Sequence, residues 1–353
     1  MKILISGICG FVGSTIAARL HGDGREVFGF DNFIRPGSEL NRLALKKRGI
    51  KVTHADVRNA ADMAALPAAD WVIDAAANPS VLAGVDGQTS SRQLVEHNLF
   101  GTVNLLEYCK AHRAGFLLLS TSRVYAIAPL AELKVKAVAK AFRPAGTGRP
   151  RGISASGVAE DFSTSAPVSL YGSTKLASET LALEYGATFN FPVWINRCGV
   201  LAGAGQFGRA DQGIFSFWIH SWRQKRPLKY IGFGGKGFQV RDCLHPHDVV
   251  TLMLKQMQAT NAGTRPQIVN VSGGVKNSMS LAQLSDWCAG RFGPHAVASD
   301  AAPRAFDIPW MVLNSALASK IWNWQPAIRL ENVLDEIADH AESHPEWLDI
   351  SAP

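Results

Sequence analysis

Near its start the chain reads Gly7-Ile8-Cys9-Gly10-Phe11-Val12-Gly13, with a glycine at every third position. The apolar run of residues 2–6 before this turn is typical of a strand, and residues 11–20 after it have the apolar spacing of a helix. Gly7 permits a tight turn, Gly10 lets the backbone approach a pyrophosphate, and Gly13 allows close packing of the helix. The free N–H groups of the first helical turn, at Phe11 and Val12, then face the phosphates. The stretch therefore predicts a strand, turn and helix that bind a dinucleotide.

An acidic residue follows at the distance that this kind of site requires. Residues 26–30 read as a second strand that ends in Asp31, close to the roughly 20-residue spacing of an acid that binds the adenosine ribose. A carboxylate that accepts hydrogen bonds from the ribose hydroxyls repels the additional phosphate of NADP. We therefore expect NAD as the cofactor. Arg35 leaves NADP open as an alternative, although a loop arginine here also suits the edge of the adenine or plain solvation.

The rest of the first half alternates between strands and helices. Further strands are expected at residues 50–54, 70–74, 115–119 and 191–196, and a long helix at residues 93–112. This alternation predicts an α/β fold with a doubly wound parallel sheet. Asp56 and Val57 follow a strand and suit contact with adenine, while a turn or N-cap aspartate is an equally good interpretation. Ala75 and Ala76 end the next strand with small side chains, over which a cofactor can lie.

Tyr171 and Lys175 are one helical turn apart in Tyr171-Gly172-Ser173-Thr174-Lys175. A nearby ammonium lowers the pKa of a phenol from about 10, so such a tyrosine can accept a proton near neutral pH. The spacing also occurs by chance on many helices. Ser120-Thr121-Ser122 supports the catalytic interpretation, because hydroxyls after a strand can hold a reacting alcohol against the tyrosine.

Size, charge and cysteine content exclude several classes of protein. The 353 residues are 47% hydrophobic and 18% charged, which is enough for a large core. The net charge is +7, but Lys and Arg are scattered, so a phosphorylated small molecule is a better partner than nucleic acid. The five cysteines have no CxxC or Cys/His spacing, so we expect neither a disulfide framework nor a metal site. Without a signal sequence or a long apolar run, a soluble, cytoplasmic protein with no membrane partner is expected.

The chain divides into two predicted parts. Residues 1–196 form the dinucleotide-binding Rossmann domain, in which residues 126–170 are an irregular lid or substrate-facing insertion. Residues 197–353 form mainly a smaller α/β substrate-binding lobe, interleaved in part with the first domain. Arg241 and Arg304 are candidates for holding a substrate diphosphate, since guanidinium groups make bidentate phosphate contacts; ordinary surface arginines are the alternative.

Taken together, these motifs resemble those of the extended short-chain dehydrogenase/reductases that act on nucleotide sugars, over almost the whole chain. Besides the residues above, the resemblance includes Asn98, Gly101-Thr102 and Gln239-Val240-Arg241-Asp242. Within this family the chain is similar to the CDP-tyvelose epimerases, also called CDP-paratose 2-epimerases. That similarity lies in Gln206-Phe207, Asp211-Gln212-Gly213, Gly237-Phe238, Gly273-Gly274 and Asn277-Ser278.

The resemblance implies a role for each matching residue. Tyr171 would be the acid/base, Lys175 would lower its pKa and hold the nicotinamide ribose, and Thr121 would orient the sugar hydroxyl. The implied NAD site comprises Gly7, Gly10, Phe11, Val12, Gly13, Asp31, Asn32, Arg35, Asp56, Val57, Ala75, Ala76, Asn98, Tyr171 and Lys175. The implied substrate site comprises Ser122, Arg123, Gln206, Phe207, Gln212, Tyr230, Arg241 and Arg304. The resemblance also implies a homodimer or homotetramer that pairs through helices near residues 93–112 and 171–185.

The implied reaction is epimerisation through a transient keto-sugar with bound NAD, most specifically 2-epimerisation of a CDP-deoxysugar. Dehydratases of the family carry Asp-Glu after the catalytic threonine, where this chain has Ser122-Arg123, so dehydration is disfavoured. A 4-epimerase, a net dehydrogenase or decarboxylase, and a non-enzymatic NAD-binding regulator remain as alternatives. Val200 and the pairs Tyr125-Ala126 and Ala202-Gly203 depart from the family pattern on the sugar side.

Overall fold

The computed structural model describes residues 1–85, 87, 90–146, 148–209, 212–259 and 264–351. Asp211, part of one quoted motif, and Thr147 in the insertion lie outside the described residues. The strands are β1 (Lys2–Ser6), β2 (Glu26–Asp31), β3 (Lys51–His54), β4 (Trp71–Asp74), β5 (Gly115–Thr121), β6 (Val135–Val138), β7 (Ala141–Pro144), β8 (Ile153–Ser154), β9 (Gly157–Val158), β10 (Val193–Cys198), β11 (Val200–Leu201), β12 (Leu228–Ile231), β13 (Val240–Leu244), β14 (Ile268–Val271), β15 (Ser278–Ser280), β16 (Val297–Asp300) and β17 (Trp310–Met311).

The α-helices are α1 (Phe11–Gly22), α2 (Ser38–Lys47), α3 (Ala60–Ala64), α4 (Ser91–Val95), α5 (Gly101–His112), α6 (Ile127–Ala131), α7 (Ser169–Phe189), α8 (Ile214–Arg223), α9 (Pro246–Met257), α10 (Leu281–Phe292), α11 (Ala316–Trp322), α12 (Leu330–Ser343) and α13 (Trp347–Ser351). A π-helical turn, η1 (Glu96–Phe100), joins α4 to α5, so the long helix expected at residues 93–112 has a π-helical interruption.

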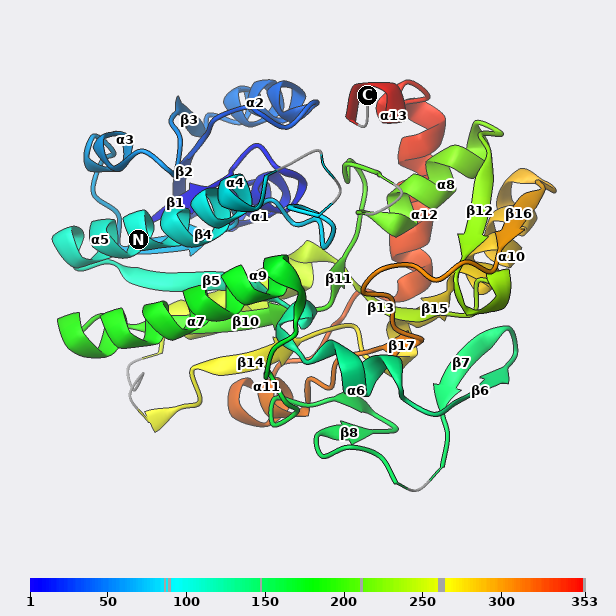
Figure 1. The fold of residues 1–353 in the computed structure, drawn as a ribbon. Coiled ribbons are helices and arrows are strands. Elements are labelled where there is room, and N and C mark those ends of the chain that lie inside the picture. The colour runs from blue at the N-terminus through cyan, green and yellow to red at the C-terminus, as the bar shows by residue number, and fades with distance from the viewer. Residues whose placement is uncertain (86, 88–89, 147, 210–211, 260–263, 352–353) are drawn as a thin grey trace.

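The main sheet has seven strands in the order β14-β10-β5-β4-β1-β2-β3. Every neighbouring pair in it is parallel, which confirms the predicted doubly wound α/β fold. The order reverses between β1 and β4, and ligands of such sheets bind outside the carboxyl ends of the strands at this point. The edge strand β14 comes from the C-terminal half of the chain, so that half contributes to both parts of the molecule (Figure 1).

Alternate residues of the strands pack against helices on opposite faces of the sheet. On one face, Ile3 and Ile5 of β1 belong to a core with residues of α1, α2, α9 and α11. On the other face, Leu4 of β1 belongs to a core with residues of α3, α5 and α7. Strands covered on both sides are near-continuous apolar runs, which is why residues 3–5 carry no polar side chain.

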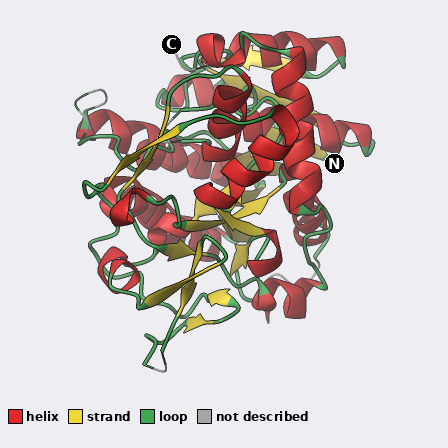
Figure 2. Ribbon diagram, turned by 90° about the vertical axis from the view of Figure 1, so that its right-hand side faces the viewer, coloured by secondary structure: helices red, strands yellow, loops and turns green. Residues whose placement is uncertain are grey.

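The second lobe has its own core, formed by α8, α10 and α12 around Trp218, Leu284 and Ile337. The strands β11, β13, β15 and β17 form a small sheet that is separate from the main sheet. In Figure 2 this side of the molecule faces the viewer. The domain boundary near residue 196 remains a prediction. The helix α8 packs in the core of the second lobe, whereas α9 and β14, which follow it in the chain, pack with the main sheet.

Residues 126–170 are more regular than expected. They contain α6 and two hairpins, β6–β7 and β8–β9. The β6–β7 hairpin contacts the second lobe: Phe142 packs edge-on against Phe233 and Phe238, and its N–H donates to the Phe238 carbonyl at 2.9 Å. These strands are two to four residues long, and β6 is largely exposed, so they lack the alternation that identifies a strand from sequence. A lid or substrate-facing role for this segment remains a prediction.

All five cysteines are free and buried. Among the described residues, no helix combines the length and apolar character needed to cross a bilayer.

Candidate active site

The glycine turn between β1 and α1 has the geometry that the sequence predicts. Gly7 has a φ of +60°, and a Cβ at Gly13 would lie 2.3 Å from the carbonyl oxygen of Gly7. Gly10 is the N-cap of α1 and offers no side-chain cap, and the first turn of α1 has no acidic residue. The amides of this turn, including those of Phe11 and Val12, are therefore available to an anion. This cradle fits the pyrophosphate of a dinucleotide.

Asp31 ends β2 beside this turn. Its carboxylate accepts hydrogen bonds from the backbone N–H groups of Cys9 at 3.0 Å and Phe33 at 2.9 Å, which hold it in one orientation. Burial raises the pKa of Asp31, and these hydrogen bonds oppose the rise. The carboxylate is thus placed where β2 ends, as expected of a ribose ligand.

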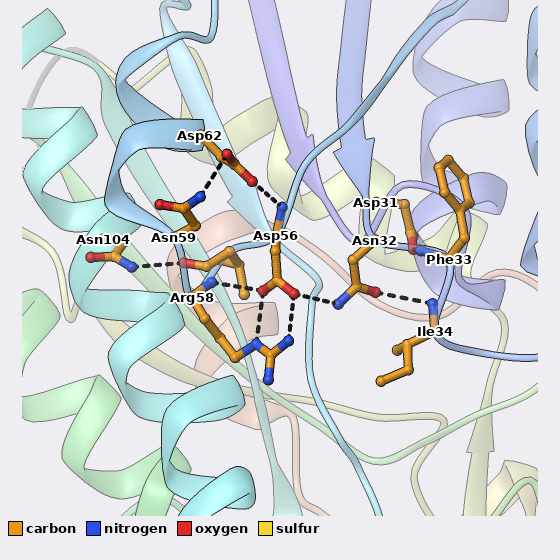
Figure 3. A network of polar contacts seen from close by, with 10 residues as sticks. Asp31, Asn32, Phe33, Ile34, Asp56, Arg58, Asn59, Asp62 and Asn104 are labelled. Atoms are coloured by element: carbon orange, nitrogen blue, oxygen red, sulfur yellow. Dashed lines mark hydrogen bonds and ion pairs between the residues drawn. The ribbon is translucent and has the colours of Figure 1, made fainter.

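Figure 3 shows how Asn32 connects the ends of β2 and β3. Asn32 Nδ2 donates to Asp56 at 3.0 Å, and Arg58 pairs with the same carboxylate at 2.7 Å. The hydrogen bonds from Arg58 hold the pKa of Asp56 well below its usual range. Asn32, Ile34, His54, Asp56 and Arg58 line an open hollow, and Asp56, Arg58 and Phe100 line a second. These hollows lie next to Asp31, where the adenine of a dinucleotide is expected.

Val57 occupies a different position from Asp56. Its side chain packs against Gly101 of α5, and its carbonyl accepts from Asn104 Nδ2 at 2.8 Å. Val57 therefore joins β3 to α5, and its contact with adenine remains a prediction.

Arg35 reaches from the loop after β2 to the second lobe. Arg35 Nη1 donates to Gln212 Oε1 at 3.3 Å, and its guanidinium lies 5.5 Å from the centre of the Phe207 ring. Phe207 stacks on Trp347 of α13, and the backbone carbonyl of Gln206 accepts a hydrogen bond from the Trp347 indole N–H at 2.9 Å. The structure thus brings Arg35, Phe207 and Gln212 together across the two lobes, while their ligand contacts remain predictions.

The end of β4 is tied to β1 by buried polar groups. Ser6 Oγ donates to Asp74 at 2.9 Å and accepts from the amides of Ala75 and Ala76, both at 3.0 Å. Thr102 donates to the other oxygen of Asp74 at 2.8 Å. A Cβ at Gly7 would meet Ala76 at 2.9 Å, so Ala76 packs directly under the glycine turn.

Asn98 lies on η1 and holds neighbouring segments together. Its side-chain amide accepts a hydrogen bond from the Asn78 N–H at 2.8 Å and donates one to Thr174 Oγ1 at 3.2 Å. Its backbone carbonyl accepts a hydrogen bond from Ser178, which lies one turn after Thr174 on α7. Asn98 thus positions the helix that carries Tyr171 and Lys175. Its contact with the cofactor remains a prediction.

The structure brings Tyr171, Lys175 and Thr121 together. Thr121 ends β5, and α7 carries both Tyr171 and Lys175, which are 7% and 2% exposed. Burial raises the pKa of Tyr171 to about 12, while a hydrogen bond with Thr121 and the positive charge of Arg123 oppose this rise. An effect of the Lys175 charge on the pKa of Tyr171, which the sequence led us to expect, remains a prediction. Burial lowers the pKa of Lys175 itself, and the nearby carboxylates of Asp74 and Glu179 oppose that change.

A cluster of arginines lies near Tyr171. Arg241 on β13 pairs with Asp307 at 3.0 Å and donates to the carbonyls of Val240 and Ile308. Arg123 and Arg304 belong to the same cluster. Burial lowers the pKa of Arg123, the charges of Arg241 and Arg304 lower it further, and the Asp307 carboxylate opposes this change. Guanidinium groups make bidentate contacts with phosphate oxygens, so the cluster suits a multiply charged anion such as a diphosphate.

Two of the predicted substrate residues have other partners. Tyr230 donates to Ser285 Oγ at 2.6 Å and stacks on Trp218, within the core of the second lobe. Gln206 Nε2 donates to the Leu201 carbonyl at 2.7 Å. Ser122 begins the turn η2 (Ser122–Val124) beside Thr121 and is half-buried. Substrate contacts of these three residues remain predictions.

The sequence did not single out several residues that build this site. Asp307 lies in an irregular segment, where no periodicity draws attention to it. Arg58 follows Asp56 by two residues, so the Asp-x-Arg spacing was an available signal. Glu179 lies one turn after Lys175, which puts it on the same helical face.

The glycine cradle, Asp31, Thr121, Tyr171 and Lys175 all lie within the part of the chain that matches a known protein family. The model of the NAD dependent epimerase/dehydratase family matches residues 3–272. The chain belongs to this family. Its cofactor is therefore NAD, and the predictions of an NAD-dependent enzyme of the epimerase class and of the extended short-chain dehydrogenase/reductase fold are confirmed.

Individual members of the epimerase/dehydratase family are similar over most of the chain. CDP-paratose 2-epimerase of Salmonella typhi is 29% identical over 82% of this chain and 85% of its own length. UDP-glucuronate 4-epimerase of Thermodesulfobacterium geofontis is 26% identical over 98% of this chain and 97% of its own. The structure of UDP-glucuronic acid 4-epimerase from Bacillus cereus, with NAD and a fluorinated UDP-sugar, has a TM-score of 0.76. It is 25% identical and covers 97% of this chain and 99% of its own.

Proposed function

We propose that the protein is an NAD-dependent nucleotide-sugar epimerase that inverts C2 of a CDP-deoxysugar of the CDP-paratose and CDP-tyvelose type. The observation that carries the nucleotide-sugar class is the position of Tyr171 between Thr121 and the arginine cluster of Arg123, Arg241 and Arg304. A proton acceptor beside a group of cations suits a neutral hydroxyl attached to a charged diphosphate. The similarity to the Salmonella typhi CDP-paratose 2-epimerase and the shared motifs near Gln206 and Arg241 support the CDP-deoxysugar.

In the proposed reaction, the chain's residues bind the sugar nucleotide and move one proton. Arg241 and Arg304 hold the diphosphate, and Thr121 holds the reacting hydroxyl against Tyr171. Tyr171 takes the hydroxyl proton and returns it after the keto-sugar has turned to present its other face. Bound NAD supplies the acceptor and then the donor of the hydride. Gly7, Gly10, Gly13 and Asp31 would hold the cofactor, and Lys175 its nicotinamide ribose.

A second candidate function is 4-epimerisation of a UDP-sugar. The UDP-glucuronate 4-epimerase of Thermodesulfobacterium geofontis matches nearly the whole chain, and the Bacillus cereus enzyme of that name supports the same candidate. The proposed roles of Tyr171, Thr121 and the arginines are the same for both reactions, since only the carbon facing Tyr171 differs. A net dehydrogenase or decarboxylase is a further alternative, and it would release NADH.

The test is a panel of CDP-, UDP- and GDP-sugars, including CDP-paratose and UDP-glucuronate, with the products identified by NMR. An epimer of CDP-paratose at C2 supports the first proposal, and an epimer of a UDP-sugar at C4 supports the second. Growth of NADH absorbance in proportion to product supports the dehydrogenase instead. Tyr171→Phe is the matched control: it should bind NAD as the unaltered protein does and form no product. No product from any sugar would refute an epimerase of nucleotide sugars.

We also propose a cytoplasmic homodimer or homotetramer that pairs through α5 and α7. Exposed apolar side chains at the ends of these helices support this pairing: Phe100 immediately before α5 is 54% exposed, and Leu170 and Phe189 on α7 are 40% and 45% exposed. Light scattering during gel filtration measures the mass, and a monomer at micromolar concentration would contradict this proposal.

A further inference from the structure

The loop between β2 and α2 connects the expected adenosine site to the second lobe. It comprises residues 32–37, directly after Asp31, and we call it the adenosine loop. At its first position, Asn32 Nδ2 donates to Asp56 at 3.0 Å, and Asn32 Oδ1 accepts from the Ile34 N–H at 3.2 Å. The start of the loop is therefore fixed to the residues at which the adenosine of NAD is expected.

The backbone of the adenosine loop adopts a conformation that needs support from its surroundings. Phe33 has a φ of +56°, in the left-handed region that a bulky side chain rarely occupies. A backbone conformation of this kind persists only where neighbouring contacts hold it. The shape of the loop therefore depends on contacts with other parts of the chain.

The far end of the adenosine loop lies against the second lobe. A Cβ at Gly37 would lie 3.1 Å from Phe207 Cε1 and 3.5 Å from Ile350 Cγ2. The Arg35 guanidinium lies 5.5 Å from the centre of the Phe207 ring, and its Nη1 donates to Gln212 at 3.3 Å. The loop thus packs on the segment before α8 and on α13, which is a neighbour of α2 in Figure 1.

Phe207 is itself held in place by α13. Its ring stacks on Trp347 with 5.7 Å between the ring centres, and the two residues are only 5% and 4% exposed. The Gln206 carbonyl accepts from the Trp347 indole and from Ser216 of α8, both at 2.9 Å. The Phe207 ring is therefore buried between α13 and the adenosine loop and has a fixed position.

We propose that Phe207 is a positioning residue for NAD, which holds the adenosine loop so that Asp31 and Asn32 stay in place for the adenosine. The second lobe thereby helps to retain the cofactor, through Phe207 and Trp347. The proposal rests on the proposed function in one respect, the assignment of NAD to Asp31 and the glycine turn. It is independent of the sugar and of the carbon that reacts.

Calorimetry of NAD binding to the nucleotide-free protein tests this role. Phe207→Leu removes the ring that contacts Gly37, and Trp347→Ala removes the ring on which Phe207 stacks. We expect each variant to raise the Kd of NAD at least about tenfold, and Trp347→Phe, which keeps an aromatic ring, to restore most of the affinity. Ile350→Ala is a milder change near the end of the chain and should raise the Kd by a smaller factor.

Phe215→Leu is the matched control, because Phe215 is a buried ring of α8 within the core of the second lobe. It should lower the stability of the protein and leave the affinity for NAD unchanged. The proposal is overturned if Phe215→Leu weakens NAD binding as much as Phe207→Leu does. It is also overturned if folded Phe207→Leu binds NAD as the unaltered protein does, which is the result expected if Phe207 serves only the substrate.

A double variant tests whether Phe207 acts through the adenosine loop. Because the loop begins at Asp31, Phe207→Leu should weaken NAD binding by a smaller factor in Asp31→Ser than in the unaltered protein. A merely structural role of Phe207 would give the same factor in both proteins, and that result also overturns the proposal.

These binding measurements require no substrate, so their outcome is independent of the sugar panel. If the panel yields no product while the Phe207 and Trp347 variants lose affinity for NAD, the proposed function fails and the role of Phe207 stands.

Discussion

Arg197 on β10 and Glu179 on α7 form a buried ion pair, with 2.6 Å between Arg197 Nη2 and Glu179 Oε2. Ser120 donates to the same carboxylate, and Arg197 also donates to the Tyr125 hydroxyl at 3.3 Å. The ion pair ties β10 to α7, and the bond from Ser120 ties β5 to the same carboxylate. Ser120 precedes Thr121, and Glu179 follows Lys175 by one turn, so these contacts hold β5 against the part of α7 that carries Lys175.

Removing one partner of this pair should destabilise the protein strongly. Glu179→Leu leaves the Arg197 guanidinium buried without its counter-charge, at a cost of about 3–5 kcal/mol in the free energy of unfolding. Urea unfolding measures this cost. The double variant Glu179→Leu with Arg197→Met should lose less than the sum of the two single variants, and full additivity would contradict the pairing.

The glycine cradle predicts a specific loss of NAD. In Gly13→Ala the new Cβ would lie 2.3 Å from the Gly7 carbonyl, so the turn must open and its amides leave the phosphate position. We expect NAD affinity to fall by at least about tenfold, as measured by calorimetry. Gly22→Ala, at the end of the same helix with open space around it, is the control and should bind NAD normally. Equal affinity in the two variants would refute the assignment of the cradle.

Asp31 should determine the preference for NAD over NADP. Asp31→Ser removes the charge that repels a phosphate on the ribose. The dissociation constant for NADP divided by that for NAD should therefore fall by about tenfold. The exposed Asp335→Asn on α12 loses the same charge elsewhere and serves as the control. A preference that is unchanged in Asp31→Ser would show that another group selects the cofactor.

A pair of histidines, His220 buried and His340 half-buried, should make the second lobe sensitive to acid. His220 on α8 and His340 on α12 lie 3.2 Å apart, and burial lowers the pKa of His220 to about 3 and that of His340 to about 4. His344 and Arg226 add positive charge to this region. Because the ordinary pKa of histidine is about 6.5, the unfolded chain binds more protons below that value, and stability is lost as the pH falls from about 6.5 to about 4.

The measurement for this pair is the urea midpoint at about pH 7.5 and at about pH 5. The midpoint should be lower at the acidic pH, and His220→Phe should reduce the difference. His112→Gln, an exposed histidine on α5, should leave the difference unchanged. If His220→Phe and the unaltered protein lose the same stability between the two pH values, the histidine pair is not the cause.

Much of the first half of the site was predictable because its signals are local. The positive φ at Gly7 and the lack of room for a Cβ at Gly13 both require glycine. The glycines in the sequence therefore predict the turn. Asp31 and Thr121 each end a strand whose apolar run is visible in the chain. Tyr171 and Lys175 share a helical face by their spacing alone.

The second half of the site depended on contacts between distant segments. Nothing in the apolar pattern of residues 268–271 distinguishes β14 as the edge of the main sheet from a strand of the second lobe, because both environments bury it. The short strands of residues 135–158 contact segments that are distant in the chain: Phe142 of β7 bonds to Phe238, and Val158 of β9 bonds to Val312 and Asn314. Contacts of this kind produce no periodic pattern in the sequence.

The sequence by itself determined the glycine turn, the acid that ends β2 and the one-turn spacing of Tyr171 and Lys175. Each follows from backbone sterics or helical spacing within a few residues. Only the tertiary structure decided which charges surround Tyr171. Arg123, Arg241 and Asp307 are far apart in the chain, and they meet because β5, β13 and the segment before β17 pack around one place. Contacts between such distant segments depend on how the whole core packs. The sequence around each of these residues therefore does not predict them.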